Sequence, residues 1–318
     1  MKRITLFLLL QLFALQLFAQ EVIGENQPQE KTGVTSSSEI LLQAAFKPAP
    51  EGKLGFIEHF NFPFLQGEGG LTKDNNISLA LTGEISPISI NGIVEAVWTP
   101  IAFFQFAAGG RFGSGWNIDL FGNEIYGIGL NRPSADMSGE HDGKAFDGLL
   151  WKAQTGATLQ ADLAAVFPGD WNHVVLRSYH EINYSGYTRA AKGESWYYEN
   201  DDGENCNGFN YYGNLLIGYQ MPIFLNTVAL MAEADLYLYD TPDRAKWGDD
   251  KIRWTFACAL IFSITKQIDL TLITQFRTQK NYLEENWEDL YYRNRTIDSP
   301  NPLHLEFYRV AAAVSFKF

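Results

Sequence analysis

The sequence is poor in the features that mark several other classes of protein. It has only 2 cysteines among 318 residues, and Cys206 lies in a polar stretch whereas Cys258 lies in an apolar one, so we expect no disulfide. Beyond the N-terminus there is no run of 18 or more apolar residues. A membrane protein built of helices is therefore excluded, which leaves a soluble exported protein or a closed barrel.

Positive charge is also scarce. The chain has 24 Lys and Arg against 37 Asp and Glu, for a formal net charge of −13. Binding to the phosphates of nucleic acid needs a basic surface, so we expect no nucleic-acid partner. The sequence contains two Gly-x-Gly pairs, Gly113-Ser114-Gly115 and Gly127-Ile128-Gly129. Neither is followed by the helix and lysine that a phosphate-binding loop requires, so we expect no bound cofactor.

The N-terminus has the composition of an export signal. Lys2 and Arg3 precede an apolar segment from Leu6 to Phe18, and Ala19 offers a small residue at which a signal peptidase cleaves. We predict a signal peptide over 1–19, cleaved after about Ala19. Residues 20–37 are polar and lack periodicity, which predicts a flexible leader on the periplasmic side.

The rest of the chain is rich in aromatic residues and glycine and alternates between apolar and polar positions. It has 23 Phe, 15 Tyr, 8 Trp and 28 Gly, with a mean hydropathy of −0.15. Alternation with a period of two is typical of strands that have one apolar and one polar face. The expected strands are 38–48, 54–62, 76–86, 89–98, 102–114, 148–166, 171–187, 208–220, 225–239, 250–264, 267–280 and 303–318.

The terminal strand has the clearest pattern. Counting back from the C-terminus, one face carries Phe318, Phe316, Val314, Ala312, Val310 and Tyr308, and the other carries charged or small residues until Phe307 interrupts the alternation. A terminal Phe at the end of such a run resembles the C-terminal assembly signal of bacterial outer-membrane β-barrels. The resemblance implies the bacterial outer membrane as location, lipid and the barrel-assembly machinery as partners, and Phe318, Phe316 and Val314 as assembly residues.

The connections support the same architecture. Tight turns such as Phe167-Pro168-Gly169-Asp170 alternate with long polar stretches, such as 116–146 and 281–302. Membrane barrels have short periplasmic turns and long external loops. We therefore predict an all-β fold in which residues 38–318 form one closed antiparallel transmembrane β-barrel of about twelve strands, with ten or fourteen as alternatives.

The inward-facing positions predict a passive channel or uptake protein for small solutes. Carrying the alternation round the barrel places charges of both signs on the inner face, where they form either selectivity rings or structural ion pairs in a narrow interior. The predicted lumen-lining residues are Glu95, Arg111, Lys152, Asp162, Arg177, Glu181, Glu233, Asp235, Arg253, Asp269, Arg277 and Arg309.

Two alternatives remain open. Ser178 and His180 lie two apart on one strand and face outward, as do the Ser and His of outer-membrane lipid hydrolases, although the order is reversed from the His-x-Ser of those enzymes and the sequence offers no residue to orient the imidazole. The other alternative is a non-conducting surface protein that presents acidic loops.

One of these acidic loops offers oxygen ligands for a cation. Asp201, Asp202 and Glu204 surround Gly203, but the spacing is not that of an EF-hand loop. We therefore expect a solvated acidic loop and no metal site.

Overall fold

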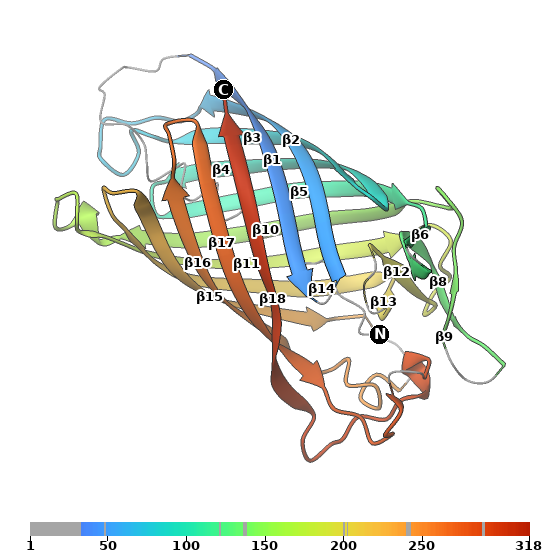
Figure 1. Cartoon of the computed structure of the whole chain (residues 1–318). Coiled ribbons are helices and arrows are strands. Elements are labelled where there is room, and N and C mark those ends of the chain that lie inside the picture. The colour runs from blue at the N-terminus through green and yellow to red at the C-terminus, as the bar shows by residue number, and fades with distance from the viewer. Residues whose placement is uncertain are drawn as a thin grey trace.

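Twelve long strands close into a barrel. The computed structural model describes residues 33–318, apart from 48, 121, 136–138, 200, 202, 240–242 and 288–289. The ring order is β1-β18-β17-β16-β15-β14-β11-β10-β5-β4-β3-β2, and every neighbouring pair is antiparallel (Figure 1). The strands are β1 (Thr35–Lys47), β2 (Ala49–Pro63), β3 (Asn76–Ser86), β4 (Ser89–Ile101), β5 (Phe104–Gly115), β10 (Leu150–Asp162), β11 (His173–Tyr187), β14 (Gly208–Gln220), β15 (Leu225–Tyr237), β16 (Arg253–Ser263), β17 (Ile268–Lys280) and β18 (Leu303–Lys317).

The predicted all-β, closed antiparallel transmembrane barrel is therefore confirmed, and the strand number is twelve. The predicted signal peptide and most of the leader lie outside the described residues. Within the described part of the chain, no helix is long and apolar enough to cross a membrane.

The first and last strands of the barrel meet where the ring closes. β18 pairs with β1 from Glu39 opposite Lys317 to Phe46 opposite Val310. Beyond the last strand residue, Phe318 exchanges two backbone hydrogen bonds with Ser38, at 2.9 and 3.0 Å. The terminal strand thus supplies the last seam of the barrel, which removes both free sheet edges.

A β-bulge in β18 corrects one of the predicted faces. Tyr308 was expected to point outward with Val310, but it is buried, whereas Phe307 is 46% exposed on the outer face. Gln275 pairs with Arg309 and the next residue, Phe276, pairs with Phe307, so Tyr308 is an extra residue in the ladder. The bulge shifts the alternation by one residue. The interruption at Phe307 in the sequence is therefore the bulge itself.

β2 is longer than predicted and carries an outward carboxylate. The expected strand 54–62 extends to Ala49–Pro63. Glu58, which weakens the apolar pattern there, pairs in register with Ser38 and accepts a hydrogen bond of 2.6 Å from its hydroxyl. This bond to a neighbouring strand gives the polar group a partner on the outer face.

The outer face is apolar and has aromatic residues near both ends of the strands. Near the external ends, Trp151 stacks on Tyr184 at 5.0 Å, and Phe276 contacts Phe307 at 5.7 Å. Near the periplasmic ends, Trp98 stacks on Phe106 at 5.8 Å. Two such rows are typical of the membrane–water boundaries of a transmembrane barrel.

The long external connections contain strands that the sequence did not predict. β8 (Ile128–Pro133) and β9 (Gly139–Asp142) pair with β12 (Ser195–Tyr198) and β13 (Asn205–Cys206) in one sheet, and β6 (Ile118–Leu120) pairs with β7 (Asn123–Ile125). Figure 1 shows these strands at the end of the barrel away from the C-terminus. We call the four connections 116–149, 188–207, 238–252 and 281–302 together the external cap.

Candidate functional site

The predicted lumen-lining charges are arranged mainly as pairs. Lys152 Nζ lies 2.7 Å from Glu181 Oε1, and Lys317 Nζ lies 2.7 Å from Asp269 Oδ2. Arg277 Nε lies 2.9 Å from Glu306 Oε1. Charges that are removed from bulk water need such partners, because an uncompensated charge is costly at low dielectric.

Arg309 has the most complete set of contacts in this group. Its side chain is almost fully buried and donates from Nε to Gln275 Oε1 at 2.8 Å and from Nη1 to Glu51 Oε2 at 3.2 Å. The guanidinium also lies over the ring of Tyr308, 4.9 Å from the centroid. The bulge that turns Tyr308 inward therefore provides this stacking contact.

The other predicted residues have polar or aromatic neighbours. Glu95 accepts from Gln154 at 3.4 Å, Asp162 lies 2.7 Å from His173, and Arg177 lies over the ring of Tyr179 at 5.4 Å. Glu233 accepts from Asn214 at 3.3 Å, and Arg253 donates to the Tyr237 hydroxyl at 2.9 Å. Asp235 is in register with Arg253 on the neighbouring strand.

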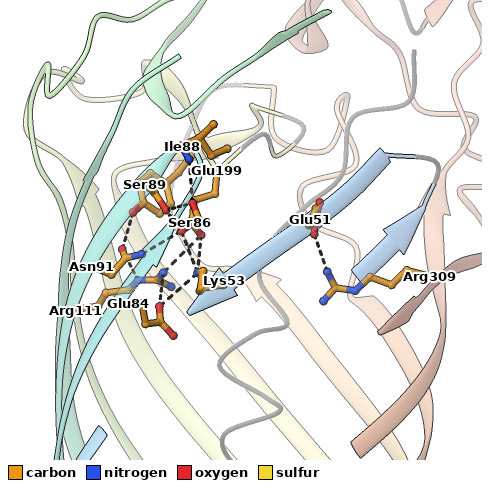
Figure 2. Close-up of polar contacts among 11 residues, drawn as sticks. Glu51, Lys53, Glu84, Ser86, Ile88, Ser89, Asn91, Arg111, Glu199 and Arg309 are labelled. Atoms are coloured by element: carbon orange, nitrogen blue, oxygen red, sulfur yellow. Dashed lines mark hydrogen bonds and ion pairs between the residues drawn. The ribbon is translucent and has the colours of Figure 1, made fainter. Parts of the chain in front are cut away.

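Arg111 belongs to a larger group at the external end of the barrel. We call this group the mouth cluster, and its members are Lys53, Glu84, Ser89, Asn91, Arg111 and Glu199. Figure 2 shows the first five on the barrel wall, with Glu199 reaching them from the external cap and the Glu51–Arg309 pair to one side.

Glu199 is held by four donors. Its Oε1 accepts from the Ser89 hydroxyl and from Asn91 Nδ2, the latter at 3.0 Å. Lys53 Nζ lies 3.0 Å from Oε1 and 3.3 Å from Oε2. Arg111 Nη2 lies 3.5 Å from Oε2, so both carboxylate oxygens face a cation.

Glu199 reaches this position by crossing the barrel mouth. Its connection joins β11 to β14, whereas Lys53 lies on β2, five places from β11 in the ring of twelve strands. The backbone of Glu199 has φ of 50°, in the left-handed region, and its N–H donates to Gly127 O at 2.7 Å. A non-glycine residue in that region is strained and persists only where surrounding contacts hold it.

The wall residues are pre-arranged to present their donors. Asn91 Oδ1 accepts from Arg111 Nε at 3.0 Å and from the Tyr198 hydroxyl, so its amide turns Nδ2 toward Glu199. Ser89 donates its single proton to Glu199. Ser86, 2.7 Å away, therefore supplies its own proton to Ser89.

The electrostatic balance of the mouth cluster is neutral. Lys53 and Arg111 also contact Glu84 Oε2, at 3.4 and 3.3 Å, which gives two cations and two carboxylates. Burial opposes ionisation of Glu199, but Lys53 and Arg111 outweigh it and hold the pKa of Glu199 below its usual value. Glu199 is therefore a carboxylate at neutral pH.

A second buried group ties the parts of the external cap together. Lys280 Nζ lies 2.7 Å from Asp249 Oδ1 and 2.9 Å from Glu204 Oε2, and Arg295 lies 3.6 Å from Glu204. Ser195 donates to Asn131 O at 2.8 Å. These contacts link all four connections, so the segment that carries Glu199 is part of one assembly.

The predicted acidic loop is used within this assembly. The pKa of Glu204 is below its usual value, because Lys280 and Arg295 outweigh the opposing effect of burial. Asp201 Oδ1 accepts from the backbone N–H of Gly203 at 2.9 Å. Asp202 lies outside the described residues. The carboxylates of Asp201 and Glu204 thus have different partners.

Ser178 and His180 are brought together on the outer face of β11. Ser178 Oγ lies 3.0 Å from His180 Nε2, and His180 Nδ1 lies 2.7 Å from the Tyr211 hydroxyl. Tyr211 is the third residue that sequence reasoning could not name, because it lies on the next strand. Ser178 is, however, six residues below Tyr184 of the outer aromatic row, or roughly 14 Å below it for a tilted strand.

That depth does not suit hydrolysis of a lipid ester. Ester groups lie near the membrane–water boundary, whereas Ser178 faces the hydrocarbon between the two aromatic rows. The bonds among Ser178, His180 and Tyr211 instead satisfy polar groups that have no water to bind.

Sequence reasoning missed most of the mouth cluster. Lys53 and Glu84 lie on strands in which the alternation between apolar and polar residues is weak or is formed by small residues. Glu199 lies in a polar connection. The aromatic run Trp196-Tyr197-Tyr198 before Glu199 was the only local signal that this connection is packed and not solvated.

Comparisons with known proteins add a general likeness of architecture. No protein-family model matches the chain, and no curated protein matches it as a relative. Among solved structures, the KdgM porin matches with 11% identity and a TM-score of 0.39, covering 88% of this chain and 99% of that chain. The NanC porin matches with 10% identity and a TM-score of 0.40, covering 88% of this chain and 100% of that chain.

A third match is a domain of an autotransporter. The β domain of the Bordetella autotransporter BrkA matches with 8% identity and a TM-score of 0.42, covering 89% of this chain and 98% of that chain. At these scores the likeness does not extend beyond general architecture, and the fold is established by the pairing of the chain's own strands.

Proposed function

We propose that the protein is a passive channel for small polar solutes across the bacterial outer membrane, narrowed at its outer mouth by the segment that carries Glu199. The observation that carries this proposal is the charge pattern of the inner face. Charges of both signs recur from Arg111 and Glu199 at the external end to Lys317 and Asp269 at the periplasmic end. Such a surface favours water and polar solutes.

Polar atoms without protein partners support a hydrated interior. Within the described residues, Gln43 Nε2, Thr271 Oγ1 and Glu233 Oε2 are buried and have no hydrogen-bond partner. Buried polar groups are almost always satisfied, by protein or by ordered water. Water in the barrel would satisfy these three atoms.

Single-channel recording of the refolded protein in a planar bilayer tests the proposal. We expect discrete current steps and, under a salt gradient, a reversal potential near zero, because the charges of both signs on the inner face are mostly arranged as ion pairs. A bilayer that stays silent at all voltages would refute the channel and favour a non-conducting surface protein.

Export is part of the same proposal. We propose cleavage after about Ala19, followed by insertion through the barrel-assembly machinery with the C-terminal strand as the signal. N-terminal sequencing of the membrane-inserted protein is expected to begin at Gln20. A mature chain that retains Lys2 and Arg3 would contradict the cleavage.

A further inference from the structure

The barrel wall presents a group of hydrogen-bond donors aimed at one carboxylate. We call this group the mouth donors, and its members are Lys53, Ser89, Asn91 and Arg111. All four lie on strands of the barrel, whereas the carboxylate they hold belongs to Glu199 of the external cap. We propose that the mouth donors are a binding site for the carboxylate group of a small organic anion, and that Glu199 fills this site when no solute is bound.

The geometry is that of a receptor and not of a simple ion pair. Two neutral donors, Ser89 and Asn91, converge on Oε1, while Arg111 faces Oε2 and Lys53 lies near both oxygens. The amide of Asn91 is fixed by Arg111 and Tyr198 on its other side. Charge-assisted hydrogen bonds from fixed donors are the strongest means of recognising a carboxylate.

The charge of the wall matches a single negative charge. Without Glu199, the ion pairs that Lys53 and Arg111 make within the described part of the chain are those with Glu84, which leaves two cations against one carboxylate in the mouth cluster. A solute with one carboxylate restores neutrality. A neutral solute leaves buried charge unpaired, which is unfavourable.

Glu199 is a suitable competitor because it is tethered and strained. Glu199 occupies the site with a backbone φ of 50°, which residues other than glycine rarely adopt. A free carboxylate has no such constraint. A tether that holds one ligand at a high effective concentration lowers the apparent affinity for a competing free ligand.

This inference rests on the proposed channel function and adds the class of solute that the channel carries. Its test is a measurement of binding, which does not depend on ion current. Sodium gluconate and sorbitol are a matched pair of open-chain probes that differ at one terminal carbon, which is a carboxylate in gluconate and a CH2OH group in sorbitol. Titration calorimetry uses the full-length refolded protein in detergent micelles, with wild type, Glu199→Gln, and the double variant Lys53→Met with Glu199→Gln. The double variant removes one charge of each sign, so its fold is less perturbed than that of a single Lys53 variant.

We expect Glu199→Gln to bind gluconate at least about tenfold more tightly than the wild type, because the tethered competitor loses its charge. We expect the double variant to lose this gain, and sorbitol to bind no variant measurably. Equal gluconate affinity in wild type and Glu199→Gln would overturn the proposal, and so would tight binding that persists in the double variant.

Two checks keep the outcome clear. Heat-modifiable migration in gel electrophoresis shows whether each variant forms the barrel, and Ser89→Ala with Glu199→Gln replaces the double variant if that protein does not fold. Gluconate binding without ion currents would refute the channel and leave the site intact. Currents without competition between Glu199 and gluconate would refute the site and leave the channel intact.

Discussion

Neutralising Glu199 tests whether the mouth cluster holds the external cap against the barrel. The Glu199→Gln variant keeps the shape of the side chain but removes its attraction to Lys53 and Arg111, whose distances to the carboxylate are 3.0 and 3.5 Å. The side chains of Lys53 and Glu199 are only 1% and 2% exposed, so water screens these contacts little. Removing one partner of a buried ion pair costs about 3–5 kcal/mol.

Part of that loss is recovered in the variant. The amide of Gln still accepts from Ser89 and Asn91, and a neutral hydrogen bond contributes about 1 kcal/mol. The two retained bonds offset about 2 kcal/mol, so we expect the local opening free energy of the segment 195–199 to fall by about 1–3 kcal/mol. Since 1.4 kcal/mol corresponds to a factor of ten, amide hydrogen exchange there accelerates roughly 5- to 150-fold.

Hydrogen exchange measured by mass spectrometry gives the answer directly, because the Glu199 N–H is protected by Gly127 O at 2.7 Å. Glu194→Gln is the matched control in the same connection. Glu194 lies 3.5 Å from Arg132, but both side chains are more than a third exposed, so its loss changes exchange at 195–199 very little. Equal exchange rates in wild type and Glu199→Gln would refute the stabilising role of the cluster.

Lowering the pH is expected to weaken the hold of the mouth cluster on Glu199, as the Glu199→Gln substitution does. The pKa of Glu199 in the folded protein is below the ordinary glutamate value of 4.5, so its stabilising contribution is fully present above that value. The contribution is lost as the pH falls through the lowered folded pKa. Fluorescence of Trp196, three residues away, reports the transition, and the Glu199→Gln variant is expected to show a smaller change. If the acid transition is unchanged in that variant, the group whose protonation causes it is not Glu199 but another group, such as Glu204.

Three further predictions concern other parts of the fold. Gly113→Ala places a Cβ in steric conflict with Asn91 Oδ1, so we expect a lower melting temperature than for Gly92→Ala, whose Cβ meets nothing within 4 Å. Lys280→Met removes the cation that contacts both Asp249 and Glu204 and leaves Glu204 with Arg295 as its ion-pair partner, so we expect the cap to lose about 3–5 kcal/mol in denaturant unfolding, whereas loss of an exposed lysine in the cap changes little. Deleting Phe318 removes its two backbone bonds across the seam, so we expect less membrane-inserted barrel per cell, and unchanged insertion would contradict its role as an assembly residue.

The barrel was predictable from the sequence because its signal is local. In β15–β18 exposed apolar residues alternate with residues that point inward, most of them polar or small, although Met231, Ile261 and Ile273 are buried apolar residues on the inner side. Lipid on the outer side enforces that period. The error at Tyr308 shows the limit of the method. The position of a bulge depends on how β18 pairs with β17. The sequence of β18 alone does not determine whether Phe307 or Tyr308 is the outward residue.

The mouth cluster was less predictable because its contacts join residues far apart in the chain. Glu199 is 146 residues from Lys53 and 108 from Asn91, and its position depends on the pairing of β12 with β8 in another connection. A polar stretch with four carboxylates favours a solvated loop on composition alone. The contacts of Tyr198 with Asn91 and of Glu199 with Lys53 show that the stretch folds back onto the wall.

Single-channel recording of wild type and Glu199→Gln in planar bilayers tests the central claim most directly. We predict discrete conductance steps with little preference between cations and anions in the wild type, and larger or more frequent openings in Glu199→Gln, because the segment that narrows the mouth is held less firmly. Correctly folded protein that carries no current in either form would contradict the claim that this barrel is a channel.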